Sequence, residues 1–191
     1  ITLVGEGFRL SREEVVAYGY DPAALPGVLR PYLIGRDIVR RFEERYVIDF
    51  HGLADDEARR QHPKLFEHVV REVKPQRMQQ NDAQRKAKWW LFGRSGTDLR
   101  NALKMLPSYI ATSRTARHRL FATISAVTVP DTKLVAIALE GSEYLAALSS
   151  GVHLAWARSK SGFLGVGNDP TYNHSDIFET FPFPEMNPAV R

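Results

Sequence analysis

The residues with the greatest capacity for chemistry are cations interleaved with aromatic side chains in the middle of the sequence. Four of these cations precede the run Trp89-Trp90-Leu91-Phe92-Gly93-Arg94. Lysine and arginine displace the counterions condensed on a polyanion such as DNA and hold its phosphates. For the two tryptophans core packing is the alternative, and we favour it for at least one of them. We predict phosphate contacts from Arg77, Arg85, Lys86, Lys88 and Arg94.

A second basic stretch, Ala111-Thr112-Ser113-Arg114-Thr115-Ala116-Arg117-His118-Arg119, mixes small hydroxyls with guanidinium groups. Such side chains reach both phosphates and base edges, and arginine paired with guanine is the commonest specific contact in DNA complexes. A hairpin with a predicted turn at Pro130-Asp131 follows it. The alternative interpretation of the stretch is an exposed turn. The residues predicted to approach base edges are Ser113, Arg114, Arg117, His118, Thr128, Asp131 and Lys133.

Motifs for catalysis, metal binding and nucleotide binding are absent from the sequence. The chain has no cysteine, its six histidines form no H-x-x-x-H pair, and no G-K-[ST] loop occurs. Two bare glycine pairs, Gly5-Glu6-Gly7 and Gly165-Val166-Gly167, are predicted to be turns. We therefore predict no catalytic residue, no metal ligand and no cofactor in this chain.

One arrangement imitates a metal-dependent nuclease. Many nucleases hold Mg²⁺ with an Asp…Glu-x-Lys set. A similar order occurs here, with Asp49 or Asp55 as the aspartate and Glu72-Val73-Lys74 after it. In such sites the Glu-x-Lys lies on a strand, whereas here it ends a helical pattern at Pro75. A Mg²⁺-dependent nuclease that uses Asp49, Glu72 and Lys74 is kept as an alternative function, and a protein-interaction module is the third.

The charge distribution favours a surface that faces a polyanion. The chain has 191 residues and a net charge of +4. Residues 59–119 contain fifteen Lys or Arg and four Asp or Glu, a net of +11, while the remainder holds eleven against eighteen, a net of −7. Solvated helix faces are the alternative explanation. No apolar run reaches the ~20 residues that span a bilayer, so no membrane partner is expected.

Local patterns predict both helices and short strands. Ser11 and Glu14 have the spacing of a capping box, which predicts a helix to about Tyr18. Other helices are predicted over 55–61, 63–73, 97–105 and 142–156, the last with a break near residues 149–151. Strands are predicted over 46–50, 109–112, 120–124, 126–129 and 134–139, and residues 21–35 are predicted to be a segment punctuated by turns. We predict an α+β fold with a mixed, mainly antiparallel sheet and flanking helices.

Several motifs together are typical of one protein family. They are Gly5-Glu6-Gly7-Phe8, Arg30-Pro31-Tyr32-Leu33-Ile34-Gly35-Arg36-Asp37, Tyr46-Val47-Ile48-Asp49-Phe50, Val73-Lys74-Pro75-Gln76-Arg77, Trp89-Trp90-Leu91-Phe92-Gly93-Arg94, Tyr109-Ile110-Ala111-Thr112, Leu148-Ser149-Ser150-Gly151-Val152-His153 before Trp156, and Phe178-Glu179-Thr180-Phe181-Pro182-Phe183-Pro184. With these motifs the chain resembles the target-recognition domain of type IIG restriction–modification enzymes of the MmeI kind. The match spans nearly the whole chain, and its final motif is the most specific.

The resemblance implies a role in sequence-specific binding of double-stranded DNA. In that family an upstream methyltransferase domain binds S-adenosylmethionine and methylates a flipped adenine at N6. The Asn/Asp-Pro-Pro-Tyr motif and glycine-rich loop of that domain are missing here, which implies a cytoplasmic, non-catalytic chain. S-adenosylmethionine, and Mg²⁺ for any attached nuclease, would be bound elsewhere in the enzyme. Because the sequence begins at Ile1 instead of methionine, we expect a fragment: one recognition domain over 1–191, with lobes of about 1–107 and 108–191.

Overall fold

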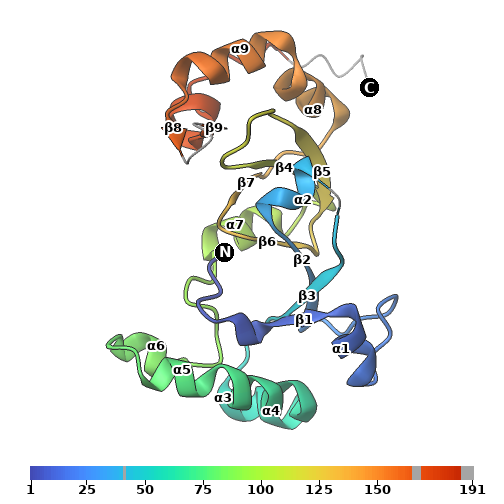
Figure 1. Cartoon of the computed structure of the whole chain (residues 1–191). Coiled ribbons are helices and arrows are strands. Elements are labelled where there is room, and N and C mark those ends of the chain that lie inside the picture. Colours follow the sequence, from blue (N-terminus) through green and yellow to red (C-terminus); the bar gives the residue numbers. More distant parts are fainter. Residues whose placement is uncertain (41, 165–168, 186–191) are drawn as a thin grey trace. The chain divides into compact units, whose positions relative to one another are not determined.

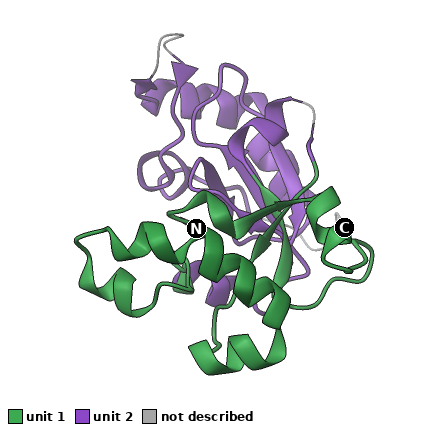
Figure 2. Ribbon diagram, turned by 60° about the horizontal axis from the view of Figure 1, so that its bottom comes forward, with its two compact units in different colours: residues 1–33, 44–97 green, residues 34–43, 98–191 purple. Residues whose placement is uncertain are grey.

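The chain forms two compact units built from helices and short strands. A computed structural model describes residues 1–40, 42–164 and 169–185, so the predicted turn at Gly165-Val166-Gly167 lies outside the described residues. Unit 1 contains residues 1–33 and 44–97, and unit 2 contains residues 34–43 and 98–191 (Figure 2). Among the described residues, no helix combines the length and the apolar character needed to cross a membrane.

Unit 1 contains three antiparallel strands. The central strand β3 (Arg45–Ile48) pairs with β1 (Arg9–Ser11) and with β2 (Leu29–Leu33), as labelled in Figure 1. Strand β3 confirms the prediction over 46–50, because its aromatic and β-branched residues fill a buried strand. Strand β2 was not predicted. Pro31 lies in this strand opposite Tyr46. Prolines are typical of turns and interrupt the alternation of apolar and polar residues, so the sequence pattern did not indicate a strand here.

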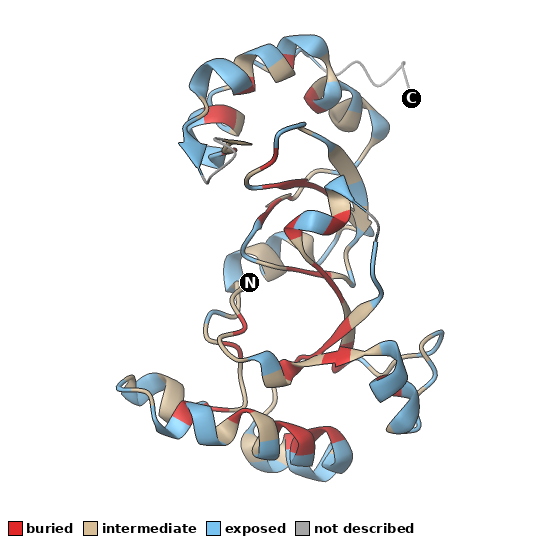
Figure 3. Cartoon of the chain, in the orientation of Figure 1, coloured by how far each residue is buried: buried red, intermediate tan, exposed pale blue. Residues whose placement is uncertain are grey.

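Unit 1 also contains helices, of which α1 (Arg12–Ala17) packs on β1 and β3. Helix α1 begins at the predicted capping box: the Glu14 amide donates to Ser11 Oγ at 3.3 Å, and the Ser11 amide donates to Glu14 Oε2 at 2.7 Å. Helix α4 (Pro63–Glu72) buries one side, which Figure 3 shows in red. After η1 (Glu6–Phe8), the other helices of the unit are α3 (Asp55–Gln61), α4 (Pro63–Glu72), α5 (Lys74–Met78) and α6 (Ala83–Ala87).

Unit 2 contains an antiparallel sheet in which β4 (Ser108–Ser113) lies between β5 (Phe121–Ser125) and β7 (Leu134–Ile137). These strands lie close to three of the predicted ranges. The strand predicted over 126–129 is largely wrong, because Ala126–Thr128 form a turn and only Val129–Pro130 are extended, as β6. The antiparallel pairing in both units and the helices around it confirm the predicted α+β fold.

The rest of unit 2 covers the sheet with helices. Ser150 separates two of them and caps the second, since its Oγ accepts from the His153 amide at 3.2 Å; this confirms the predicted break. The C-terminal aromatic motif, residues 178–184, packs on these helices. The ring centroids of Phe181 and the buried His153 lie 4.6 Å apart. The elements are α2 (Gly35–Val39), α7 (Thr97–Leu103), α8 (Ser142–Ser149), α9 (Gly151–Lys160), the hairpin β8 (Phe163–Leu164) and β9 (Asp169–Pro170), and the π-helical turn η2 (His174–Phe178).

Candidate nucleic-acid interface

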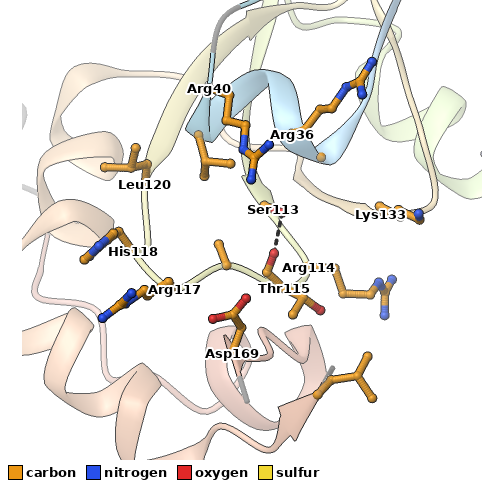
Figure 4. A pocket seen from close by; sticks show the side chains of 14 residues that line it. Arg36, Arg40, Ser113, Arg114, Thr115, Arg117, His118, Leu120, Lys133 and Asp169 are labelled. Carbon is orange, nitrogen blue, oxygen red and sulfur yellow. Dashed lines mark hydrogen bonds between the residues drawn. The ribbon is translucent and has the colours of Figure 1, made fainter. Parts of the chain in front are cut away.

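A hollow of about 780 Å³ lies in unit 2 beside the loop that follows β4. Figure 4 shows the side chains that line it, which come from α2, from the loop, from the turn before β7 and from β9. Basic side chains outnumber acidic ones in the lining, where Asp169 contributes a carboxylate. The basic lining residues are Arg36, Arg40, Arg114, Arg117, His118 and Lys133.

Helix α2 forms one wall of the hollow. Its start is held by Asp37, whose Oδ2 accepts from the Ile34 amide at 2.9 Å. Gly35 allows the helix to approach the strand ends closely: a Cβ there would lie 3.0 Å from the Lys133 carbonyl oxygen and 3.1 Å from Ser113 Oγ. The Arg36 guanidinium is directed to Glu43 at 2.9 Å, which leaves Arg40 as the arginine of this wall nearest to the loop in Figure 4.

Arg114 is exposed but held in place. Its amide donates to the Lys133 carbonyl at 2.7 Å, and its Nε donates to the Thr132 carbonyl at 3.1 Å. The second bond fixes the guanidinium plane and leaves both terminal amino groups to donate outward. A guanidinium held in this way offers two parallel N–H groups to an acceptor pair.

Arg119 anchors the other end of the loop. Its terminal nitrogens donate to the Ser113 carbonyl, to Thr112 Oγ1 at 3.3 Å and to the Pro170 carbonyl at 3.0 Å, and its guanidinium stacks 5.1 Å from the centre of the Tyr172 ring. Burial of this cation lowers its pKa to about 10. The short segment from Arg114 to His118 is therefore fixed at both ends.

Five of the seven residues predicted to read bases line the hollow, but only four are exposed there. These four are Arg114, Arg117, His118 and Lys133. Ser113 is 5% exposed and its hydroxyl donates to the Thr115 carbonyl at 2.9 Å, so it shapes the loop, and its base contact stays a prediction.

The other two predicted base readers, Thr128 and Asp131, lie outside the lining. Thr128 belongs to the turn before β6, where its carbonyl accepts from the Tyr109 hydroxyl at 3.2 Å. Asp131 Oδ1 accepts from the amide of Thr132 at 2.6 Å and so supports the turn before β7.

The five predicted phosphate-binding residues all belong to unit 1. Arg77 is 1% exposed and donates to the carbonyls of Leu3 at 2.9 Å and Leu91 at 3.0 Å, so it belongs to the interior of unit 1, and its phosphate contact stays a prediction. Burial also lowers the pKa of Arg77. Arg85 forms an ion pair with Asp82 at 3.1 Å, and Lys86 is half-buried. Lys88 and Arg94 are exposed.

The aromatic motif of unit 1 is part of the core. Trp89 is buried against Phe66, with ring centroids 5.5 Å apart, and the Trp90 indole N–H donates to the Leu53 carbonyl at 3.1 Å. This confirms the core alternative for at least one tryptophan. The ammonium of Lys74 lies 4.8 Å from the centre of the Trp89 ring.

The structure does not bring Asp49, Glu72 and Lys74 together as a nuclease site would require. The Asp49 carboxylate pairs with Arg30 at 3.3 Å, and Glu72 pairs with Arg71 at 2.6 Å on α4, while Lys74 faces Trp89. Within residues 1–40, 42–164 and 169–185, no three His, Asp or Glu side chains are grouped so that they could hold a metal ion.

Four further side chains belong to this site without having been predicted from the sequence: Arg36, Arg40, Arg119 and Asp169. Arg36 and Arg40 have the i, i+4 spacing that places two side chains on one helix face. Helix α2 is only five residues long, so its own sequence pattern was too short to predict it. Arg119 stands in the second basic stretch, but its bond to the Pro170 carbonyl forms only in the tertiary fold. Asp169 joins the site only through the tertiary fold, because β9 lies far along the chain from β4. For Asp169, no sequence signal was present.

Comparisons with known proteins agree with this geometry. Residues 3–185 match the family described as MmeI, target recognition domain. A solved structure of the type IIL restriction–modification enzyme MmeI in complex with DNA has the same fold, with a TM-score of 0.71 and 16% sequence identity over 96% of this chain. The chain spans 24% of the length of that enzyme. No curated protein matches the chain. The match to the family over nearly every residue means that this chain belongs to the MmeI target recognition domain family.

Proposed function

We propose that the chain binds double-stranded DNA and reads a specific sequence within a restriction–modification DNA adenine methyltransferase. The observation that carries the proposal is the hollow of unit 2, where exposed cations stand on a loop fixed at both ends. A rigid loop favours discrimination between bases, because a wrong base then leaves a polar group unpaired. MmeI, which shares the fold, was itself solved with DNA.

The side chains of the hollow divide into two roles. Arg114 has two outward amino groups and is suited to pair with O6 and N7 of guanine. Arg117, His118 and Lys133 are proposed to approach neighbouring base edges. Phosphate contacts are proposed for Arg40 here, and for Arg85, Lys86, Lys88 and Arg94 in unit 1, because phosphate contacts hold the register of a DNA-bound protein without reading sequence.

Methyl transfer is proposed for another domain of the same enzyme. S-adenosylmethionine carries a sulfonium cation, and the arginines that line the hollow would repel it. The methyl donor, and Mg²⁺ for any attached nuclease, are therefore assigned to parts of the enzyme outside this chain. Such an enzyme would act on DNA in the cytoplasm.

The first test is selection of DNA duplexes from a randomised library by the intact protein. We expect one enriched sequence motif. Arg114→Ala should weaken binding to the selected duplex by about 1–3 kcal/mol and relax the preference at one base pair. Arg12→Ala removes an exposed arginine that is paired with Glu44 in unit 1, and it should leave the preference unchanged. Recovery of no motif, or an Arg114→Ala variant with an unaltered preference at every base pair, would refute the proposal.

A further inference from the structure

A second hollow, of about 700 Å³, lies on unit 2 next to the first. It is lined by the loop residues Arg117 to Arg119, by the last turns of α9 and by the β8–β9 hairpin. Arg117, His118 and Asp169 line both hollows. The loop is therefore a wall shared by the two concavities.

The charge of this second hollow is strongly positive. Arg117, Arg119 and Arg158 line it, and Asp169 is the carboxylate among the described lining residues. Arg158 is exposed in the last turn of α9, and neither a hydrogen bond nor an ion pair joins its side chain to the described part of the chain. Its guanidinium is available to a ligand.

Arg119 forms no ion pair with a carboxylate of the described residues. The three oxygens that it contacts belong to two carbonyls and a hydroxyl, so its charge is not neutralised by a carboxylate among the described residues. These bonds use three of its five N–H groups, and the partial burial that lowers its pKa makes the bare cation costly. An anion in the hollow would offset that cost.

We propose that the second hollow binds a phosphate of the DNA backbone through Arg158 and Arg119. The assignment rests on the proposed function, and it adds a site that the base-reading hollow does not contain. Guanidinium groups pair with phosphate oxygens in bidentate geometry, which favours arginine at such sites. A DNA strand whose phosphate is held there would pass Arg117 and His118, which line both hollows. The bound phosphate would then lie next to the bases that are read, and it would fix the register of those bases relative to Arg114.

The test uses Arg158→Ala in the intact protein with the duplex from the library selection. Because one phosphate contact is removed, we expect the plot of log affinity against log salt to become less steep by about one, and affinity for selected and random duplexes to fall by the same factor. Arg158→Lys should restore most of the slope. The matched control is Lys104→Ala, which removes one exposed charge from unit 2 just after α7 and should leave the slope unchanged. An unchanged slope in Arg158→Ala, or an equal change in Lys104→Ala, would overturn the site.

A second arm identifies the source of the phosphate. Single phosphates of the selected duplex are replaced in turn by neutral methylphosphonate. One position should weaken binding of the unmodified protein and have no further effect on Arg158→Ala. If no position behaves in this way while inorganic phosphate alone binds the protein and the binding is lost in Arg158→Ala, the hollow is a free-anion site and the DNA assignment is wrong. Either result leaves the enriched motif intact, whereas failure of the proposed function removes the motif itself.

Discussion

Two arginines in this chain show how one residue type can serve the interior and the interface. The Arg77 guanidinium donates hydrogen bonds to the carbonyls of Leu3 and Leu91 and so links two segments inside unit 1. The Arg119 guanidinium joins the end of β4 to β9 in unit 2 and also faces a hollow. Both lie near basic neighbours in the sequence, so spacing alone treats them alike. Their difference comes from burial, which only the tertiary fold decides.

Arg119 is expected to act as a positioning residue. Arg119→Ala removes three hydrogen bonds from a charged donor and should lower the free energy of unfolding by about 2 kcal/mol. Hydrogen exchange at the amides of residues 114–118 should become faster, because the loop loses one anchor. Urea denaturation and exchange measured by mass spectrometry check both effects. Arg117→Ala, an exposed neighbour, should stay within about 0.5 kcal/mol of the unmodified protein. Equal effects of the two variants would mean that Arg119 does not hold the loop.

At the scale of elements, predictability follows how local the stabilising contacts are. The capping box of α1 and the Ser150 cap between α8 and α9 are complete within four residues, and the sequence predicts the first of them and the helix break at the second. Strand β2 contains Pro31 and depends on its partner β3, so its own pattern was insufficient. The hollow shows the same limit: Arg114 and Lys133 were predicted for it, but Asp169 arrives with a distant hairpin.

Helix α2 offers a test of how elements shape the site. A methyl group at Gly35 would meet the Lys133 carbonyl and Ser113 Oγ, so Gly35→Ala should push the helix from the strand ends and lower the free energy of unfolding by about 1–3 kcal/mol. Affinity for DNA should fall as well, because Arg40 and Lys133 move apart. Gly151→Ala is the matched control, since Gly151 also begins a helix but a Cβ there has no neighbour within 4 Å. Thermal denaturation and DNA titration compare the variants, and a Gly35→Ala protein as stable as the Gly151→Ala protein would contradict the expected crowding.

At the scale of the whole molecule, each unit has a buried histidine in its interior. In unit 1, His68 contacts the Tyr18 hydroxyl at 2.7 Å and the Gly7 carbonyl at 2.9 Å. In unit 2, His153 is fully buried, with Nδ1 2.7 Å from the Leu148 carbonyl and Nε2 3.1 Å from the Tyr172 hydroxyl. Burial lowers the pKa of both imidazoles below the ordinary value of 6.5.

The lowered histidine pKa values predict acid sensitivity. In the unfolded chain the imidazoles take up protons as the pH falls below about 6.5, while the folded chain resists protonation, so stability is full above that pH and declines below it. Urea midpoints at roughly pH 7.5 and roughly pH 5.5 should show the loss. His153→Asn keeps a donor for Leu148 and cannot titrate, so the difference between the two midpoints should shrink. An unchanged difference would assign the acid sensitivity to other groups.

The division of the chain between the two units has a consequence for how new specificities arise. The polypeptide enters unit 2 at residue 34, leaves it after residue 43 and returns at residue 98. No single cut therefore yields two continuous pieces that each hold one complete unit. Exchange of residues 98–191 between relatives would bring in a new reading loop but retain Gly35 and Arg40 of the old wall. Specificity in this domain should therefore diversify through point changes on the loop more readily than through exchange of whole segments.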